Sequence, residues 1–215
     1  MPGPYRTGRS QLGTWLAAEE MSDYYRHMHV PDVDRVSADV RPMTRDDGPA
    51  FARFMERVSE GEQRFLKESH AEAAAALDTD LRPDARVRRL VAVESNGEVV
   101  GVAGAFPGSG WSSHVAELRV LVATDRRRRG IGRDLARGAL VEALNLGCRQ
   151  AYVEVVAEQE SLVAMFQDLG FEPAALLPDF VRDSAGEFHD LMLLTHRTDE
   201  QWGIHHLLGL EGLDR

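Results

Sequence analysis

The stretch that decides the fold runs from Leu118 to Gly147 and reads LRVLVATDRRRRGIGRDLARGALVEALNLG. It opens with an apolar run, Leu118–Val122, which is typical of a strand, and continues into an arginine-rich turn. After Gly130 and Gly132, apolar residues recur at helical spacing as far as Gly147, a residue type that often ends a helix. The order is therefore strand, glycine-bearing loop and helix.

The loop favours binding of a phosphate or pyrophosphate group. A helix N-terminus presents unpaired N–H groups and partial positive charge, and glycines let a ligand approach the backbone closely. The spacing is neither the nucleotide P-loop nor G-x-G-x-x-G, because Leu135 stands where a third glycine would be. It reads Arg-x-x-Gly-x-Gly from Arg127 to Gly132. The alternative interpretation is an arginine-rich turn before a surface helix.

Composition and charge limit the classes of protein. The 215 residues suit one domain with extensions, and no apolar run approaches the roughly 20 residues of a membrane span. The single cysteine, Cys148, and the absence of an apolar signal-peptide core predict a cytoplasmic protein without a membrane partner. A net charge of −10 argues against nucleic acid as a partner. It favours a cationic substrate, although acidity that only maintains solubility explains the charge equally simply.

The two ends of the sequence are predicted to be extensions. We expect an N-terminal extension at 1–35, a domain at 36–196 and a C-terminal tail at 197–215. His27, His29, Asp32 and Asp34 allow a metal-binding interpretation, but Pro31 interrupts the strand on which His-x-His would face one way. We therefore expect surface residues there and no metal.

Periodicity and turn residues predict eleven elements in the order β-α-α-β-β-β-α-β-α-β-β. The strands are expected at Val36–Arg41, Arg88–Glu94, Val99–Phe106, Trp111–Val122, Gln150–Val156, Ala174–Val181 and Phe188–Thr195. The helices are expected over Phe51–Val58, Glu62–Leu77, Ile131–Leu146 and Gln159–Leu169, with additional helical segments near Trp15–His29 and His205–Leu210. Residues 78–86 are expected to form a polar loop.

This element order, the Arg-x-x-Gly-x-Gly loop and the segment Asp168–Pro173 (DLGFEP) resemble the GNAT superfamily of N-acetyltransferases over Val36–Thr195. The resemblance implies an α/β (α+β) fold with a mixed, mostly antiparallel central sheet and helices on both faces. It implies acetyl-CoA as co-substrate and direct transfer of the acetyl group to a primary amine in a ternary complex, without metal. The expected acceptor is a small molecule, and late hairpins of this fold often pair with a second subunit, so a homodimer is also considered.

The resemblance also implies which residues bind the cofactor. Backbone groups of the fourth strand bind the pantetheine arm, and the glycine loop binds the pyrophosphate. A fourth-helix asparagine that often contacts pantetheine corresponds to Gln159, and a tyrosine that often protonates the thiolate corresponds to Phe166. The implied cofactor-binding residues are Val120, Leu121, Val122, Arg127, Arg128, Arg129, Gly130, Ile131, Gly132, Gln159 and Phe166.

Acetyl transfer needs a neutral amine, and deprotonating a lysine-type amine at pH 7 costs roughly 4–5 kcal/mol, so a base matters. The resemblance places a catalytic glutamate early in the fourth strand, at Glu117, although some members carry it one residue earlier, at Ala116. His114 is the alternative base, and it faces the opposite side from Glu117 unless a bulge intervenes. Arg119 offers a third interpretation, in which Glu117 is half of a surface ion pair.

The proton donor departs from the family pattern, because Phe166 cannot donate a proton. One alternative is that the thiolate leaves unassisted, and another is that water or a group such as the distant Tyr152 protonates it. The third is that the chain is a catalytically weak acyl-CoA-binding or regulatory module. Two further alternatives stay open: a protein amine as acceptor and a longer acyl-CoA as donor. Cys148, just past the end of the loop's helix, is expected to be buried rather than to carry an acetyl group.

Overall fold

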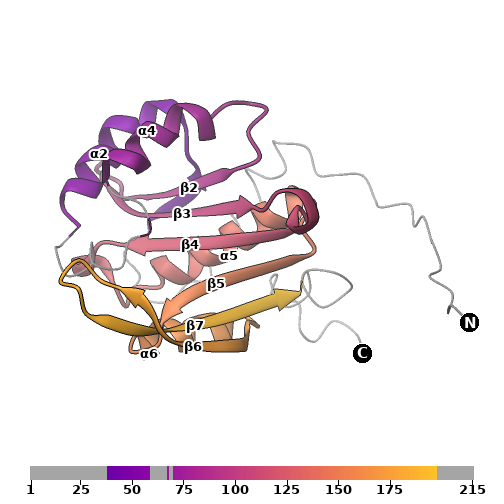
Figure 1. The fold of residues 1–215 in the computed structure, drawn as a ribbon. Coiled ribbons are helices and arrows are strands. Elements are labelled where there is room, and N and C mark those ends of the chain that lie inside the picture. The colour runs from indigo at the N-terminus through magenta and orange to yellow at the C-terminus, as the bar shows by residue number, and fades with distance from the viewer. Residues whose placement is uncertain (1–37, 59–66, 68–69, 198–215) are drawn as a thin grey trace, which may run out of the picture. The chain divides into compact units, whose positions relative to one another are not determined.

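The computed structural model describes residues 38–58, 67 and 70–197 (Figure 1). Its elements follow the predicted order. They are β1 (Asp39–Pro42), α2 (Gly48–Glu56), α4 (His70–Asp80), β2 (Arg88–Val93), β3 (Val99–Pro107), β4 (Val115–Val122), α5 (Ile131–Asn145), β5 (Gln150–Val156), α6 (Glu160–Asp168), β6 (Glu172–Arg182) and β7 (Phe188–Arg197). Short 3-10 turns cover Arg45–Asp47, Gly110–Ser112 and Thr124–Arg126. No described helix is long and apolar enough to cross a membrane.

The described strands form one sheet in the order β1-β2-β3-β4-β5-β7-β6. Among its neighbouring pairs, β4 and β5 run parallel and the others run antiparallel. The connection from β4 to β5 passes through α5, which is the helical crossover that a parallel pair requires. The predicted mixed, mostly antiparallel sheet is confirmed.

Helices cover both faces of the sheet, as predicted. On one face α5 packs closely because β3 carries Gly101, where an added Cβ would lie 2.8 Å from Leu135 Cδ1. On the other face, α2 contributes Phe51, Phe54 and Met55 to an apolar cluster that includes buried side chains of α4, β2 and β3. Since side chains alternate along a strand, Glu117, Arg119 and Leu121 of β4 lie on this second face.

Two predicted boundaries were wrong. The segment Trp111–His114 is not strand: Gly110 has a φ of 58° and begins a 3-10 turn, so β4 starts only at Val115. The second helix runs on to Asp80, because polar residues alone do not end a helix and Leu81 still donates a backbone hydrogen bond to Leu77 (2.9 Å).

Several predictions fall outside the described residues. They are the helices near Trp15–His29 and His205–Leu210, the metal-binding interpretation of His27 to Asp34, and the part of the second helix at 62–66 and 68–69. The division into extension, domain and tail stays a prediction for the same reason. Cys148 is buried, as expected, and burial raises the pKa of its thiol although Arg86 opposes this.

Candidate functional site

The central feature of the site is the divergence of β4 from β5 (Figure 1). The two strands pair at Val115–Gln150, Ala116–Ala151 and Glu117–Tyr152, and then separate although β4 continues to Val122 and β5 to Val156. We call the separated segments, Leu118–Val122 and Val153–Val156, the splay. It leaves part of the β4 backbone without a neighbouring strand on that side.

Strand alternation decides which backbone groups of β4 face the splay. Ala123 N donates to Val100 O of β3 (2.9 Å), and His114 O accepts from Arg149 N beside β5 (2.8 Å). Since N–H and C=O groups alternate in direction along a strand, those of Val120 and Val122 face the splay, whereas those of Leu121 face β3. Backbone contacts with a ligand in the splay therefore belong to Val120 and Val122 rather than to Leu121.

The glycine loop lies where β4 ends and α5 begins. Gly130 precedes the helix with a φ of 83°, and Arg128 also has a positive φ, of 60°. Gly132 lies in the first helical turn, and a Cβ added there would lie 3.5 Å from Val122 Cγ2 and 3.6 Å from Met165 Sδ, which is ordinary contact. The fold thus tolerates alanine at this position, while the absent side chain leaves the helix N–H groups approachable. These features fit a pyrophosphate.

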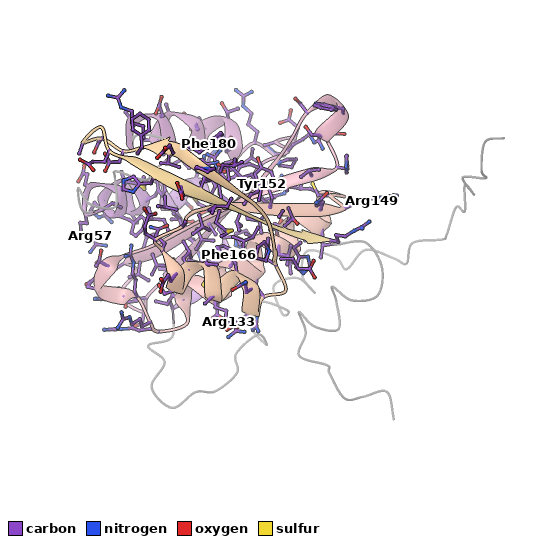
Figure 2. All side chains as sticks on the ribbon, turned by 60° about the horizontal axis from the view of Figure 1, so that its bottom comes forward. Arg57, Arg133, Arg149, Tyr152, Phe166 and Phe180 are labelled. Carbon is purple, nitrogen blue, oxygen red and sulfur yellow. The ribbon has the colours of Figure 1, made fainter. Side chains whose placement is uncertain are left out.

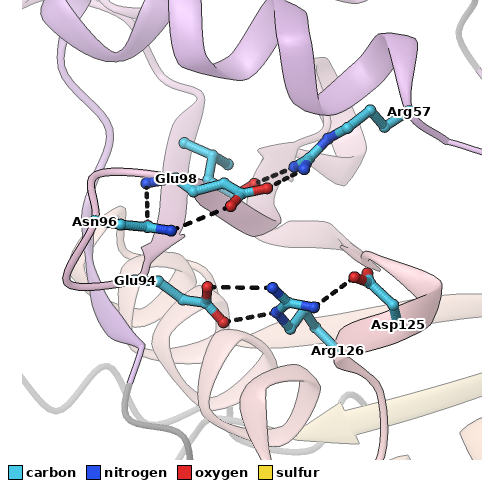
Figure 3. A network of polar contacts seen from close by, with 7 residues as sticks. Arg57, Glu94, Asn96, Glu98, Asp125 and Arg126 are labelled. Atoms are coloured by element: carbon cyan, nitrogen blue, oxygen red, sulfur yellow. Dashed lines mark hydrogen bonds and ion pairs between the residues drawn. The ribbon is translucent and has the colours of Figure 1, made fainter.

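The four arginines of the loop have different surroundings. Arg126 Nε donates to Glu94 Oε1 (2.7 Å), and the guanidinium also contacts Asp125 (Figure 3). Figure 3 also shows Arg57, at the end of α2, contacting Glu98 in the same β2–β3 turn region. Arg126 therefore anchors the loop to the sheet.

The remaining three arginines are those that the sequence assigned to the cofactor. Arg127 Nε donates to Val122 O (3.3 Å), and burial lowers the pKa of Arg127. Arg128 is exposed and Arg129 is half-buried. They carry positive charge on the loop that joins the end of β4 to α5.

Glu117 lies at the last paired position before the splay and is buried, with 8% of its surface exposed. Arg119 binds both of its carboxylate oxygens, from Nε and from Nη2, each at 3.0 Å. The Arg119 guanidinium in turn lies over the Phe106 ring, 4.3 Å from its centroid. The predicted ion pair with Arg119 exists and is partly buried, with the side chains of Arg119 and Glu117 32% and 11% exposed.

Lys67 completes this cluster, and its role was not anticipated from the sequence. Its Nζ lies 2.6 Å from Glu117 Oε1 and 2.5 Å from Glu154 Oε2. A compositional signal could have indicated it: Lys67 is the only lysine in the sequence, among 25 lysines and arginines. We call Lys67, Glu117, Arg119 and Glu154 the charged cluster.

The charged cluster sets the ionisation of the groups beside the splay. Burial acts to raise the pKa of Glu117, but hydrogen bonds from Arg119 and Lys67 outweigh it and the pKa lies below its ordinary value. Tyr152, the register partner of Glu117, has a raised pKa because of burial and because of Glu117 and Glu154. The site therefore holds an ionised carboxylate beside a protonated phenol. From the sequence we expected Tyr152 to be distant, but it lies next to Glu117.

His114 does not join this cluster. It is exposed and lies in the turn before β4, and the register of β4 with β3 and β5 runs without a shift. No bulge therefore turns His114 toward the splay. The geometry favours Glu117 over His114 as the group that acts on an acceptor.

The two predicted α6 residues lie at the C-terminal side of β5. Gln159 is exposed and directly precedes the helix. Phe166, labelled in Figure 2, is only 3% exposed. It packs edge-on against Phe171, with the ring centroids 5.2 Å apart. Phe166 therefore acts as a core residue in this structure, and contact of Gln159 or Phe166 with a cofactor stays a prediction.

Comparison with known proteins agrees with this geometry. Residues 54–171 match the family model described as the acetyltransferase (GNAT) family. The uncharacterized N-acetyltransferase YjgM of Escherichia coli (strain K12) is 30% identical over 135 residues, which cover 62% of this chain and 81% of that protein.

Solved structures share the fold. A GCN5-related N-acetyltransferase from Kribbella flavida matches with a TM-score of 0.64 and 27% identity, covering 75% of this chain and 98% of that one. The yncA protein from Salmonella typhimurium, solved with its cofactor acetyl-CoA, matches with a TM-score of 0.65 and 19% identity over 77% of this chain and 96% of that one. The chain belongs to the GNAT family of acetyltransferases and is an N-acetyltransferase.

Proposed function

We propose that the protein transfers an acetyl group from acetyl-CoA to the primary amine of a small molecule, directly, with both substrates bound together. The observation that carries this proposal is the arrangement along β4. An ionised, buried carboxylate stands where the strands begin to separate, and a glycine-bearing helix N-terminus stands where β4 ends. One strand thus connects a group suited to an amine with a site suited to a pyrophosphate.

For the cofactor, we propose that the helix N-terminus and Arg127–Gly132 hold the pyrophosphate and that the splay holds the pantetheine arm. The support is the positive charge of the loop and the outward-facing backbone of Val120 and Val122. The yncA structure contains acetyl-CoA in the same fold. When bound, acetyl-CoA supplies a thioester as the acyl donor.

For the acceptor, we propose that Glu117 attracts its ammonium group. Once the ammonium has lost a proton, Glu117 orients the resulting amine, directly or through an intervening water. Its lowered pKa keeps it ionised at neutral pH, so it binds a cation well. The phenol of Tyr152 is the proposed source of the proton for the departing thiolate, because it is protonated at neutral pH and pairs in register with Glu117. This assignment replaces the tyrosine that is absent at Phe166.

The test is release of free thiol from acetyl-CoA by the full chain, with a panel of primary amines and matched neutral alcohols. We expect thiol release that depends on the amine, and initial-rate lines that intersect when both substrates are varied. Parallel lines would contradict direct transfer in a ternary complex. Tight binding of acetyl-CoA without turnover of any amine would favour the regulatory module instead.

A homodimer and a cytoplasmic location remain proposals. Support for the dimer comes from the β6–β7 hairpin, where Leu176, Phe180 and Phe188 are 50%, 63% and 61% exposed. Figure 2 labels Phe180 of this hairpin. Exposed apolar side chains gathered on one hairpin are typical of association surfaces. Sedimentation of the full chain, compared with a Phe180→Ser variant, tests the dimer: a monomeric wild type would contradict it.

A further inference from the structure

The charged cluster contains a primary ammonium group, that of Lys67, beside the splay. Lys67 Nζ lies between two carboxylates, at 2.6 Å from Glu117 and 2.5 Å from Glu154. Glu117 and Glu154 come from neighbouring strands, β4 and β5, next to the point where those strands separate. The side chain of Lys67 is 38% exposed, so solvent reaches this ammonium.

Within the four residues of the charged cluster, the charges balance while an ammonium is present. Glu117 and Glu154 carry two negative charges, and Arg119 and Lys67 carry two positive charges. Arg119 is fixed by its two bonds to Glu117 and by the Phe106 ring, whereas Lys67 reaches the carboxylates only through its terminal group. The side chains of Glu117 and Glu154 are only 11% and 23% exposed, so their carboxylates favour another cation in place of a departing Lys67.

We propose that Glu117 and Glu154 form the binding site for the acceptor's ammonium group, and that Lys67 is an internal occupant which the acceptor displaces. This rests on the proposed function and adds two points to it. Lys67 occupies the ammonium site until the acceptor displaces it, and Glu154 is a specificity-determining residue. The sequence is rich in arginine, and its only lysine lies at this site. This placement supports the proposal independently of the strand geometry.

Lys67 acts as a competitor rather than as an acetyl acceptor. Burial acts to lower its pKa, but the hydrogen bonds with Glu117 and Glu154 outweigh it, and the pKa lies above its ordinary value. The amine is therefore held protonated, and a protonated amine has no lone pair with which to attack a thioester. Competition with Lys67 lowers the affinity of the acceptor, so removing the Lys67 charge should tighten acceptor binding.

The experiment compares binding of n-butylammonium to the full-length wild type, Lys67→Met and Lys67→Arg, with n-butanol as a neutral control ligand. Lys67→Met removes the charge at similar length, and Lys67→Arg keeps it. We expect Lys67→Met to bind n-butylammonium at least about tenfold more tightly than the wild type. We expect no gain for Lys67→Arg, no gain for n-butanol, and reversal of the gain by Glu154→Gln added to Lys67→Met.

One control keeps the outcomes distinct. Equal affinity of acetyl-CoA for every variant shows that folding and the cofactor site are intact. Equal affinity of n-butylammonium for the wild type and Lys67→Met would overturn the proposal, even if the wild type acetylates amines. Tighter binding to Lys67→Met without any turnover would support the ammonium site and refute the proposed function.

A measurement on the unaltered protein covers the case in which Lys67→Met fails to fold. Because the sequence has one lysine, isotope-labelled lysine gives one side-chain NMR signal. We expect titration with n-butylammonium, at constant ionic strength, to move this signal toward that of a free lysine. A signal that stays at its bound position while the amine saturates turnover would overturn the proposal.

Discussion

The sharpest consequence of the charged cluster concerns the role of Glu117 in catalysis, tested by Glu117→Gln. This change keeps the size of the side chain but removes the charge that Arg119 and Lys67 contact. We expect kcat to fall about 10²-fold, because losing the orientation of a bound reactant costs on this order. We also expect log(kcat/KM) to keep its rise with pH in the variant.

The pKa values show why Glu117 is not expected to be the group that titrates. An alkylammonium has a pKa of about 10.4, and an ordinary glutamate about 4.3, so equilibrium proton transfer to Glu117 costs about 8 kcal/mol. The lowered pKa of Glu117 raises this cost further. Losing the proton to bulk water at pH 7 costs only about 4–5 kcal/mol. The pH dependence should therefore follow the amine's own ionisation, and Glu117 should contribute by binding and orientation.

The assay is the pH dependence of kcat/KM with two acceptors of different pKa, for the wild type, Glu117→Gln and the control His114→Gln. His114 is exposed and outside the splay, so His114→Gln should match the wild type. The rising limb should shift with the pKa of the amine. A rising limb that is independent of the amine and disappears in Glu117→Gln would refute the reasoning and make Glu117 the titrating base.

Further predictions concern the proton donor and the stability of the fold. Tyr152→Phe should lower kcat, because it removes the phenol beside Glu117, whereas Phe166→Tyr should preserve or raise turnover; the reverse pattern in thiol-release assays would reassign the donor. The hydrogen bond from Arg41 holds the pKa of Asp47 at about 2, so Asp47→Asn should cost about 2 kcal/mol in urea unfolding at pH 7. This difference should vanish as the pH falls from about 4 toward 2, and a constant difference would contradict the ion-pair explanation. Hydrogen bonds with Glu158 and Asp183 raise the pKa of His189, so its stabilising effect should be present below about pH 6.5 and lost as the pH rises through the raised value; His189→Gln should remove this step from the stability profile.

The fold could be predicted because its signals are local. The apolar runs of β2 and β3 on either side of Asn96-Gly97, and the helical spacing that follows Gly130, depend on neighbouring residues in the sequence. The boundaries that were wrong depend on details that a pattern does not contain. The positive φ of Gly110 delays β4, and α4 runs on through polar residues to Asp80.

The site could be predicted only in part. The glycine loop and Glu117 were found because each occupies a fixed place on the fourth strand or directly after it. The separation of β4 from β5 depends on tertiary pairing, and so does the contact of Lys67 with two strands far along the chain. Tyr152 was judged distant because the parallel register that pairs it with Glu117 cannot be read from either strand alone.

The glycine loop offers the most direct test of the account, at Gly132 rather than at Gly130. Gly130 has a φ of 83°, so any side chain there strains the fold as well as blocking a ligand. At Gly132 the fold has room for a Cβ, and an acidic residue in the first turn of a helix is favourable for folding. The pair Gly132→Ala and Gly132→Asp therefore separates ligand binding from stability.

The measurement is the calorimetric affinity of acetyl-CoA for the wild type, Gly132→Ala and Gly132→Asp, with unfolding curves of all three. The account predicts that Gly132→Ala binds acetyl-CoA nearly as well as the wild type. It predicts that Gly132→Asp is as stable as the wild type but loses binding, because a carboxylate takes the place of the pyrophosphate at the helix N-terminus. Unchanged affinity of acetyl-CoA for folded Gly132→Asp would contradict the account.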